Sequence, residues 1–248
     1  MKKIKAVGII PARINSSRFP EKVIYNILGK PMIWHVYSQS KKSKLIDNII
    51  VATDSLKVVN LCNSYSIPVM MTSTKHKTGT DRLIELSNKI DANIFINIQG
   101  DEPLIKGEMI DLLIKHYIDN DFHGVTTLKT RITKDIDISN PHIVKVVTDY
   151  NDFAVDFTRV ISANLLNNKK INHCKHIGMY AYPKKLLNKI SSLSQSEKEK
   201  SNNLEQLRLL DNNIPIKVIE TYFDTIGVDI PDDIIKVENI LKNENILI

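Results

Sequence analysis

The sequence predicts an α/β fold, built on a mostly parallel twisted sheet with a smaller antiparallel lobe. Over the first 130 residues, short apolar runs alternate with amphipathic segments, as repeated β-α-β units do. The runs IIVAT and IFINI are apolar at consecutive positions, which is typical of strands that helices cover on both faces. From about residue 121, strand candidates follow one another closely, and this change of pattern predicts the antiparallel lobe.

The parallel part is predicted from seven segments in strand and helix order. They read IKAVGII, PMIWHVYSQS, IDNIIVAT, SLKVVNLCNSY, IPVMM, TDRLIELSNKI and ANIFINIQ. Ligands of such sheets bind beyond the carboxyl ends of the strands. We therefore expect the chemistry in the loops after Ile10, Thr53 and Ile98.

The antiparallel part is predicted from five further strand candidates. They read GVTTLKT, HIVKVVTD, DFAVDFTR, HIGMYAY and IPIKVIET. We interpret them as an extension that carries a second substrate site and a dimer surface. Residues 191–203 (SSLSQSEKEKSNN) are polar and predict a mobile loop. No linker rich in proline or glycine divides the chain, so one domain over residues 1–248 is expected.

Composition excludes several classes of protein. Hydrophobic residues make up 42% and charged residues 25%, which argues against a disordered or fibrous chain. The net charge of +6 comes from scattered lysines rather than blocks, which disfavours nucleic acid and suits small anionic substrates. Cys62 and Cys174 have no CxxC spacing, so neither a zinc site nor a disulfide framework is indicated, and both are expected to be buried fillers.

The apolar runs of this chain are also too short for membrane or export signals. No run reaches the roughly 18 apolar residues of a transmembrane helix. The run near the start ends at Pro-Ala-Arg, too early for the core of a signal peptide. We therefore expect no membrane association and a cytoplasmic location.

The first motif that carries chemistry is PARINSSRFPEK, residues 11–22. It follows a predicted strand and places Arg13, Arg18 and Lys22 in one loop. Such cations, together with exposed backbone N–H groups, can hold a triphosphate and offset charge on a leaving pyrophosphate. Only six of the 34 basic residues are arginines, so a retained arginine indicates a need for its planar fork. The alternative is a solvated basic loop.

Two acidic motifs form a second constellation. INIQGDEP (96–103) runs from a strand into Asp101 and Glu102, and GVDIPDD (227–233) places Asp229 just before a helix expected to begin near Pro231. Asp101 and Asp229 together suit magnesium, which takes one or two carboxylates plus phosphate oxygens. A turn composition at Asp101 and a helix cap at Asp229 are the alternatives. We expect Glu102 to be structural.

Eight motifs occur in an order that resembles a known family. They are PARINSSRFPEK, GKPMIWHVY, VATD, HKTGTDRL, NIQGDEP, HIGMYAY, LEQLRLL and GVDIPDD. This series is similar to the 3-deoxy-manno-octulosonate (Kdo) cytidylyltransferases, or CMP-Kdo synthetases, from Ile9 to about Val237. The related acylneuraminate cytidylyltransferases carry a phosphate loop like ARGGSKGIPRKN, which this chain lacks.

The resemblance implies a fold of nucleotide-diphospho-sugar transferase type, a homodimer and a Mg²⁺-dependent reaction. In it, the anomeric hydroxyl of Kdo attacks the α-phosphate of CTP, with inversion at phosphorus and loss of pyrophosphate. The implied parts are a nucleotide-binding part over about 1–130, a sugar-binding and dimerisation part over about 131–225, and a metal loop and helix over 226–248. Lipopolysaccharide or capsule precursor synthesis is the implied context.

The resemblance also implies roles for individual residues. The implied catalytic residues are Arg13, Lys22, Asp101 and Asp229, of which the two aspartates bind the metal. The implied nucleotide-binding residues are Ala12, Arg13, Arg18, Lys22, Thr78, Gly79 and Arg82. The implied sugar-binding residues are Gln99, Arg159, His176, Tyr180, Glu205 and Gln206. Arg159 is expected to pair with the sugar carboxylate, and His176 and Glu205 with its hydroxyls.

The chain departs from the family pattern at two places. The phosphate loop of the family usually reads SRLPGK, whereas here Phe19 replaces Leu and Glu21 replaces Gly. After Arg159 the chain reads VISANLLNN instead of an Ile-Pro-aromatic segment. One alternative is therefore another ulosonic acid as acceptor, such as 8-amino-8-deoxy-Kdo or a nonulosonate. A second is a nucleotidyltransferase that uses a different sugar or an alcohol phosphate as acceptor. A third is a non-catalytic homologue that binds a nucleotide or a partner.

Overall fold

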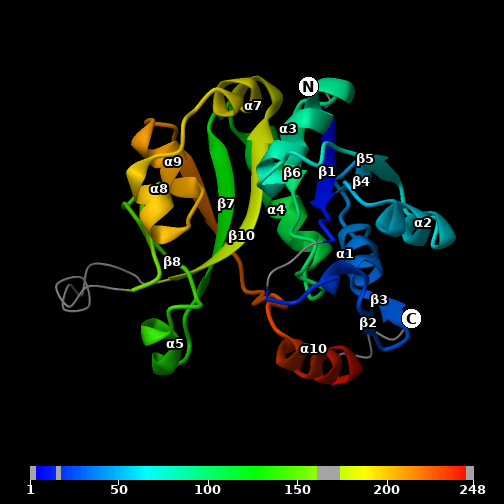
Figure 1. Ribbon diagram of the computed structural model, residues 1–248. Coiled ribbons are helices and arrows are strands. Elements are labelled where there is room, and N and C mark those ends of the chain that lie inside the picture. The colour runs from blue at the N-terminus through cyan, green and yellow to red at the C-terminus, as the bar shows by residue number, and fades with distance from the viewer. Residues whose placement is uncertain (1–3, 15–17, 161–173, 244–248) are drawn as a thin grey trace.

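The structure, a computed structural model, describes residues 4–14, 18–160 and 174–243. In this part of the chain, one sheet has the strand order β11-β7-β10-β6-β1-β4-β5, and β8 and β9 branch from β10 (Figure 1). Its strands are β1 (Ala6–Pro11), β4 (Asn48–Thr53), β5 (Val69–Met71), β6 (Ile94–Asn97), β7 (Val125–Arg131), β8 (Lys145–Thr148), β9 (Ala154–Thr158), β10 (Cys174–Pro183) and β11 (Ile216–Glu220). The predicted α/β class is confirmed.

The parallel half of the sheet is centred on β1. This strand pairs in parallel with β4 and β6, so that Ile9 lies opposite both Ile50 and Asn97. Strand β5 continues the parallel order beyond β4. The carboxyl ends of β1, β4 and β6 therefore reach the same edge, and the loops expected to carry chemistry gather there.

The other half of the sheet is mainly antiparallel and continuous with the first. Strand β10 runs antiparallel to both β6 and β7, and the β8–β9 hairpin pairs with the start of β10. Strand β11 lies parallel to β7. The five strands predicted in this half are all present, and they extend the parallel sheet instead of forming a separate layer.

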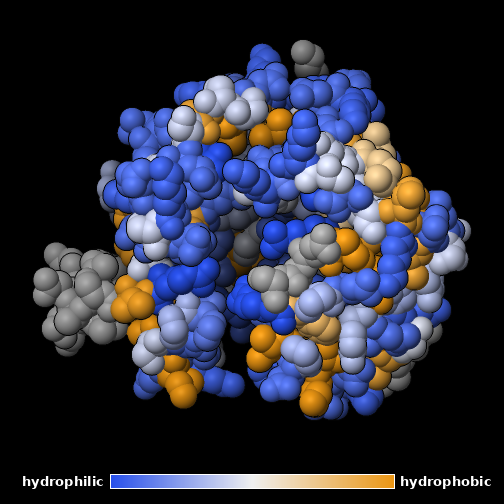
Figure 2. All heavy atoms as spheres, in the orientation of Figure 1, coloured by the Kyte–Doolittle hydropathy of each residue, from blue (hydrophilic) through white to orange (hydrophobic). Residues whose placement is uncertain are grey.

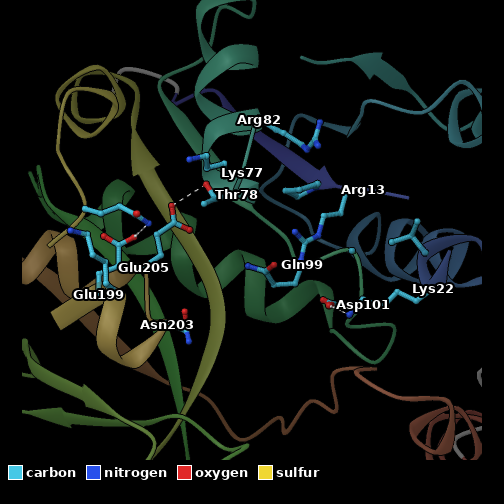
Figure 3. A pocket seen from close by; sticks show the side chains of 16 residues that line it. Arg13, Lys22, Lys77, Thr78, Arg82, Gln99, Asp101, Glu199, Asn203 and Glu205 are labelled. Atoms are coloured by element: carbon cyan, nitrogen blue, oxygen red, sulfur yellow. Dashed lines mark hydrogen bonds and ion pairs between the residues drawn. The ribbon is translucent and has the colours of Figure 1, made fainter. Parts of the chain in front are cut away.

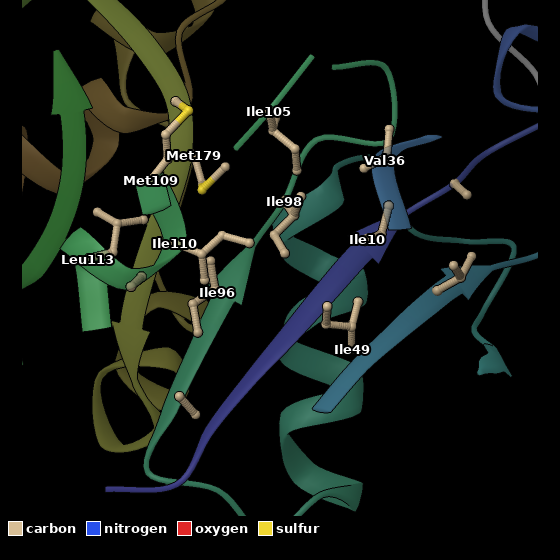
Figure 4. Packing of buried hydrophobic residues seen from close by; sticks show 14 of the residues in the cluster. Ile10, Val36, Ile49, Ile96, Ile98, Ile105, Met109, Ile110, Leu113 and Met179 are labelled. Atoms are coloured by element: carbon tan, nitrogen blue, oxygen red, sulfur yellow. The ribbon is translucent and has the colours of Figure 1, made fainter. Parts of the chain in front are cut away.

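Helices cover both faces of the sheet. The helical elements are η1 (Lys22–Ile24), α1 (Met32–Ser40), α2 (Leu56–Ser64), α3 (Gly79–Lys89), α4 (Gly107–Asp119), α5 (Asp135–Ser139), α7 (Lys184–Ser191), α8 (Glu197–Asn202), α9 (Gln206–Asp211) and α10 (Pro231–Asn243). A small separate hairpin pairs β2 (Asn26–Ile27) with β3 (Lys30–Pro31). Ile96 of β6 packs with α4 on one face, as Figure 4 shows, while its neighbour Phe95 joins the cluster of α3 and α7 on the other. Strands buried on both faces explain the consecutive apolar positions in the sequence.

A third apolar cluster joins the two ends of the chain. Phe19 and Met32 pack there with Val228 of the loop before α10 and with Ile234 and Val237 of α10. Helix α10 therefore lies below the loop that follows β1 (Figure 1). This packing brings the GVDIPDD motif, at the end of the sequence, to the phosphate-loop motif at its beginning.

The prediction of a mobile loop over residues 191–203 is wrong for the second half of that segment. Residues Glu197–Asn202 form α8, which Ser196 caps by accepting a hydrogen bond from the Glu199 N–H at 3.2 Å. Glu199 is buried and pairs with Arg208 of α9, with N–O distances of 2.7 and 2.5 Å. The polar composition that indicated a loop belongs to a short helix whose inner side is held by one buried ion pair.

Two expectations about composition can be compared with the structure. Cys62 and Cys174 are free and buried, as predicted. Within the described ranges, every helix is too short or too polar to span a bilayer.

Candidate functional site

Two cavities adjoin at the carboxyl edge of β1 and β6. We call the larger one, of about 620 Å³, the first cavity; Arg13, Lys22, Thr78, Asp101 and Lys77 are among its lining residues. The second cavity, of about 370 Å³, is lined by residues of β6, β10, α9 and the end of β9. Gln99, Asn203 and Glu205 line both cavities. Figure 2 shows the corresponding hollow near the centre of the molecule, with strongly hydrophilic residues around it.

Close backbone contact brings the loops after β1 and β6 together. A Cβ atom at Gly100 would lie 2.6 Å from the Pro11 carbonyl oxygen, and one at Gly79 would lie 3.1 Å from the Pro11 ring. Only glycine fits at position 100 without moving backbone. The spacing of these loops therefore depends on glycines in the NIQGDEP and HKTGTDRL motifs.

The loop after β1 separates its predicted nucleotide-binding residues. Arg13 is exposed and points into the first cavity beside Gln99 (Figure 3). Arg18 instead pairs with Asp229 at 3.0 Å. Ala12 is fully buried and its N–H donates to the Ala52 carbonyl at 2.8 Å, so neither its side chain nor its amide lines the first cavity. Residues 15–17 of the motif lie outside the described residues.

Lys22 joins the two predicted metal-binding aspartates. Its ammonium lies 2.5 Å from Asp101 Oδ2 and 3.6 Å from Asp229 Oδ1, and it donates to the Val228 carbonyl at 2.9 Å. Two motifs about 130 residues apart in the chain therefore converge on one positive charge. Asp229 is not the helix cap: its own N–H and that of Ile230 donate to the Asp233 carboxylate at 3.0 and 3.2 Å.

The aspartate pair is compatible with a magnesium ion. Among the described residues, no cluster of three or more metal-binding side chains occurs. Magnesium needs only one or two carboxylates, because water and substrate phosphates complete its octahedral shell. The pair already faces a cation, the Lys22 ammonium, so its carboxylates are arranged around positive charge.

Glu21 does not disturb this arrangement. Its carboxylate pairs with Lys57 on the surface at 2.7 Å, away from the first cavity. Its backbone is left-handed, with φ of +59°. Glycine, which the family usually has at this position, adopts that conformation without steric cost.

The start of α3 contributes another wall of the first cavity. Thr78 caps the helix and forms a capping box with Asp81, and its hydroxyl donates to Glu205 Oε1 at 3.2 Å (Figure 3). Arg82, predicted to bind the nucleotide, lines this wall, but its guanidinium is paired with Asp54 at 2.7 Å and donates to Thr72 at 2.7 Å. These contacts indicate that Arg82 supports the wall.

All six predicted sugar-binding residues line the second cavity: Gln99, Arg159, His176, Tyr180, Glu205 and Gln206. Gln99 and Glu205 also line the first cavity. The six come from the loop after β6, the residue after β9, strand β10 and the start of α9. The register of β10 against β7 shifts between Ile177 and Tyr180, and such a bulge re-aims side chains. Gln99 donates to the Gly178 carbonyl within this bulge at 2.8 Å.

Burial shifts the pKa values of three groups in the second cavity. It lowers the pKa of His176 to about 3, so the imidazole is neutral near pH 7 and contacts the Thr127 hydroxyl at 3.0 Å. Burial also raises the pKa of Tyr180 and of Glu205. Among the described residues, Tyr180 Oη and Asn97 Oδ1 are buried without a hydrogen bond. Such atoms need a partner, which a polar ligand can supply.

Sequence reasoning missed several lining residues. Lys77, inside the HKTGTDRL motif, lines the first cavity, and Asn97 lines the second. Both stand within motifs already quoted, so their position was a usable signal. Glu199 and Asn203 also line the first cavity. They were missed because they lie in residues 191–203, which were predicted to form a mobile loop. That Glu102 is structural stays a prediction; burial and the Asp101 carboxylate raise its pKa to about 7.

The chain is similar to proteins of one named activity. Residues 7–219 match a family profile described as cytidylyltransferase. A 3-deoxy-manno-octulosonate cytidylyltransferase from Trichlorobacter lovleyi is 40% identical over 96% of this chain and 99% of its own length. One from Thermodesulfovibrio yellowstonii is 42% identical over 95% of this chain and 98% of its own.

Solved structures agree with these relatives. A structure described as CMP:2-keto-3-deoxy-manno-octonic acid synthetase complexed with CTP superposes with a TM-score of 0.91 at 37% identity, covering 97% of this chain and 99% of that chain. An inositol-1-phosphate CTP transferase from T. maritima gives 0.66 at 13% identity, covering 97% of this chain and 96% of that chain, and shows a shared fold alone.

Proposed function

The chain belongs to the 3-deoxy-manno-octulosonate cytidylyltransferase family, and on that premise we propose that it transfers CMP from CTP to the anomeric hydroxyl of Kdo. The sugar oxygen bonds to the α-phosphorus while the bond from that phosphorus to the bridging oxygen breaks. Pyrophosphate leaves with the electron pair, and the hydroxyl proton passes to solvent. The observation that carries the proposal is the junction of a cationic cavity and a second polar cavity at Gln99 and Glu205.

The first cavity suits CTP. Arg13 and Lys77 are exposed cations on its walls, and Lys22 stands at the edge beside Asp101. These charges would hold the triphosphate and offset the charge that grows on the leaving pyrophosphate. Arg82 and Asp54 fix the wall behind them through their own ion pair.

Asp101 and Asp229 would hold the magnesium ion. Bound there, the ion would supply charge neutralisation at the phosphates. The residues of the chain then orient the reactants: Lys22 holds both carboxylates and the Val228 carbonyl in one place. Such fixed geometry removes much of the entropic barrier to a two-substrate reaction.

The second cavity suits the sugar acid. Arg159 would pair with the acceptor carboxylate, and neutral His176, Tyr180 and Glu205 would bind its hydroxyls. At a pKa of about 3, His176 is a poor general base near pH 7, so its role is to bind and orient. The segment that departs from the family after Arg159 lies, from residue 161, outside the described residues.

We extend the proposal to a cytoplasmic homodimer that supplies lipopolysaccharide or capsule precursor synthesis. The family resemblance supports this extension. Glu21 no longer supports the non-catalytic alternative. Its carboxylate pairs with Lys57, and Lys22 remains paired with Asp101.

The test is magnesium-dependent pyrophosphate release from CTP by the full chain, with the mass of the product determined. Kdo, 8-amino-8-deoxy-Kdo and N-acetylneuraminate are compared as acceptors. We expect release with Kdo and a product of the mass of CMP-Kdo. Release with only another acid would overturn the acceptor but keep the transfer, and no release with any of them would contradict the proposed function.

A further inference from the structure

Lys145, at the start of β8, is a buried cation that has no carboxylate partner among the residues that the structure describes. Its side chain has no exposed surface, and among the described residues no acid forms an ion pair with it. Its ammonium donates to two backbone carbonyls, those of Asn140 at 2.5 Å and Arg159 at 3.0 Å. Asp137 acts on it only through longer-range attraction. Burying an ammonium without a paired carboxylate is costly, so its presence here calls for a reason beyond stability.

The carbonyls that Lys145 holds belong to the surroundings of Arg159. The Arg159 guanidinium donates to the Pro141 carbonyl at 3.2 Å and to the Asn202 carbonyl at 3.4 Å. Lys145 and Arg159 therefore donate to successive carbonyls of the same turn, Lys145 to that of Asn140 and Arg159 to that of Pro141. Lys145 also holds the carbonyl of Arg159 itself, so it fixes both the backbone of Arg159 and the turn against which its guanidinium rests.

Arg159 in turn is a cation that has no counter-ion in the described part of the chain. Among the described residues no carboxylate pairs with it, and residues 161–173, which follow it closely, contain neither Asp nor Glu. Arg159 lines the second cavity, and its guanidinium has only long contacts with backbone carbonyls. An arginine held in this way is prepared for an incoming carboxylate, with which it forms a stronger, bidentate pair.

We propose that Lys145 is a positioning residue that sets the preference of the second cavity for a carboxylate-bearing acceptor, by holding Arg159 in place. The inference rests on the proposed function, because it assigns the acceptor carboxylate to Arg159. Lys145 touches no reacting atom. It acts only through Arg159, and this makes the inference testable by a double-mutant cycle.

Lys145→Met keeps an apolar stem of similar size and removes the ammonium with its two hydrogen bonds. The matched control is Lys129→Met, because Lys129 is also a buried strand lysine but pairs with Asp152 at 2.6 Å and lines neither cavity. We expect Lys145→Met to raise the KM for Kdo at least tenfold with the KM for CTP within twofold. Lys129→Met should leave both within twofold. Equal values for the two variants would overturn the inference.

Binding of non-reactive acceptors separates positioning from general loosening. The probes are 2-deoxy-Kdo and its carboxamide, measured calorimetrically with CTP present. The parent should prefer the acid, and Lys145→Met should reduce that preference at least fivefold. In an Arg159→Ala background, Lys145→Met should change Kdo kinetics less than twofold. A full effect without Arg159 would contradict action through it.

Two further results keep the test decisive. If Lys145→Met does not fold, Lys145→Gln replaces it, because its amide can still donate to one carbonyl. We expect an intermediate loss of the preference for the acid over the carboxamide. No loss would overturn the inference. If the parent releases no pyrophosphate with any acid, the proposed function fails and the inference falls with it. An active parent with unaffected variants refutes the inference alone.

Discussion

The two cavities are built in different ways. The first cavity holds the exposed cations Arg13 and Lys77 and the partly buried Lys22–Asp101 pair, at the edge of the parallel strands. The second has a buried neutral histidine and tyrosine rings on β10, with Arg159 and Arg208 as its cations. A triphosphate needs many cations, whereas a sugar acid needs one cation and several hydrogen bonds. Changes in the first cavity should therefore act on catalysis, and changes in the second on acceptor binding.

The largest effect is expected from Asp101, the member of the aspartate pair that lines the first cavity. Asp101→Asn should lower kcat by at least about a hundredfold, the scale of losing one fixed electrostatic contact at the reacting phosphate. Single-turnover pyrophosphate release at saturating magnesium measures it. Asp224→Asn, which removes an exposed partner of Lys175, is the control and should change kcat less than twofold. An unchanged kcat in Asp101→Asn would show that the metal site is misplaced.

The next effect should appear in the second cavity and spare the first. Arg159→Ala should raise the KM for Kdo about 10- to 100-fold, the range expected for a lost hydrogen bond between charged groups. The KM for CTP should stay within twofold. Arg131→Ala, which removes an exposed arginine paired with Glu220, serves as control. A loss of CTP affinity in Arg159→Ala would remove the distinction between the cavities.

Sequence predicted the first cavity better than the second. The strands β1, β4 and β6 are consecutive apolar runs, and their exits carry the acids and cations, so both fold and site follow from local pattern. His176 and Glu205 stand in ordinary strand and helix surroundings, and only the family resemblance indicated their role. Nothing local shows that β10 and α9 face one another across a cavity.

Three details lay beyond sequence reasoning for physical reasons. The partner of Arg82 is Asp54, 28 positions earlier, and an ion pair across two βα loops depends on the final register. The polar residues before Asn203 read as a loop because the pairing of Glu199 with Arg208 is invisible until α8 and α9 pack. The left-handed backbone of Glu21 became apparent only from its φ angle.

The pH dependence of stability tests the burial of the second cavity. The pKa of His176 is about 3 when folded and about 6.5 when unfolded, so between these values only the unfolded chain binds the proton. Stability from this group is complete above about pH 6.5 and falls as the pH drops toward 3, by up to about 1.4 kcal/mol per pH unit. Urea unfolding between pH 7 and 4.5 should show a smaller slope for His176→Gln. Exposed His123→Gln should keep the parent slope, and an identical slope in both variants would refute this burial.

The smallest effect concerns the departure from the family at Glu21. Glu21→Gly relieves a left-handed residue and loses one exposed ion pair, so we expect a gain of about 0.5 kcal/mol in unfolding free energy, since glycine's flexibility offsets part of the relief. The affinity for CTP, measured by calorimetry, should change less than twofold. A tenfold gain in affinity would mean that Glu21 opposes the triphosphate.

The central claim is that CMP moves to a sugar acid that lies beside the nucleotide. It is tested most directly by incubating the full chain with Kdo, magnesium and CTP labelled at the α-phosphate, and separating the products. We expect the label in a CMP-sugar acid and the pyrophosphate to be unlabelled. Label recovered only as free CMP, or left entirely in CTP, would contradict the account.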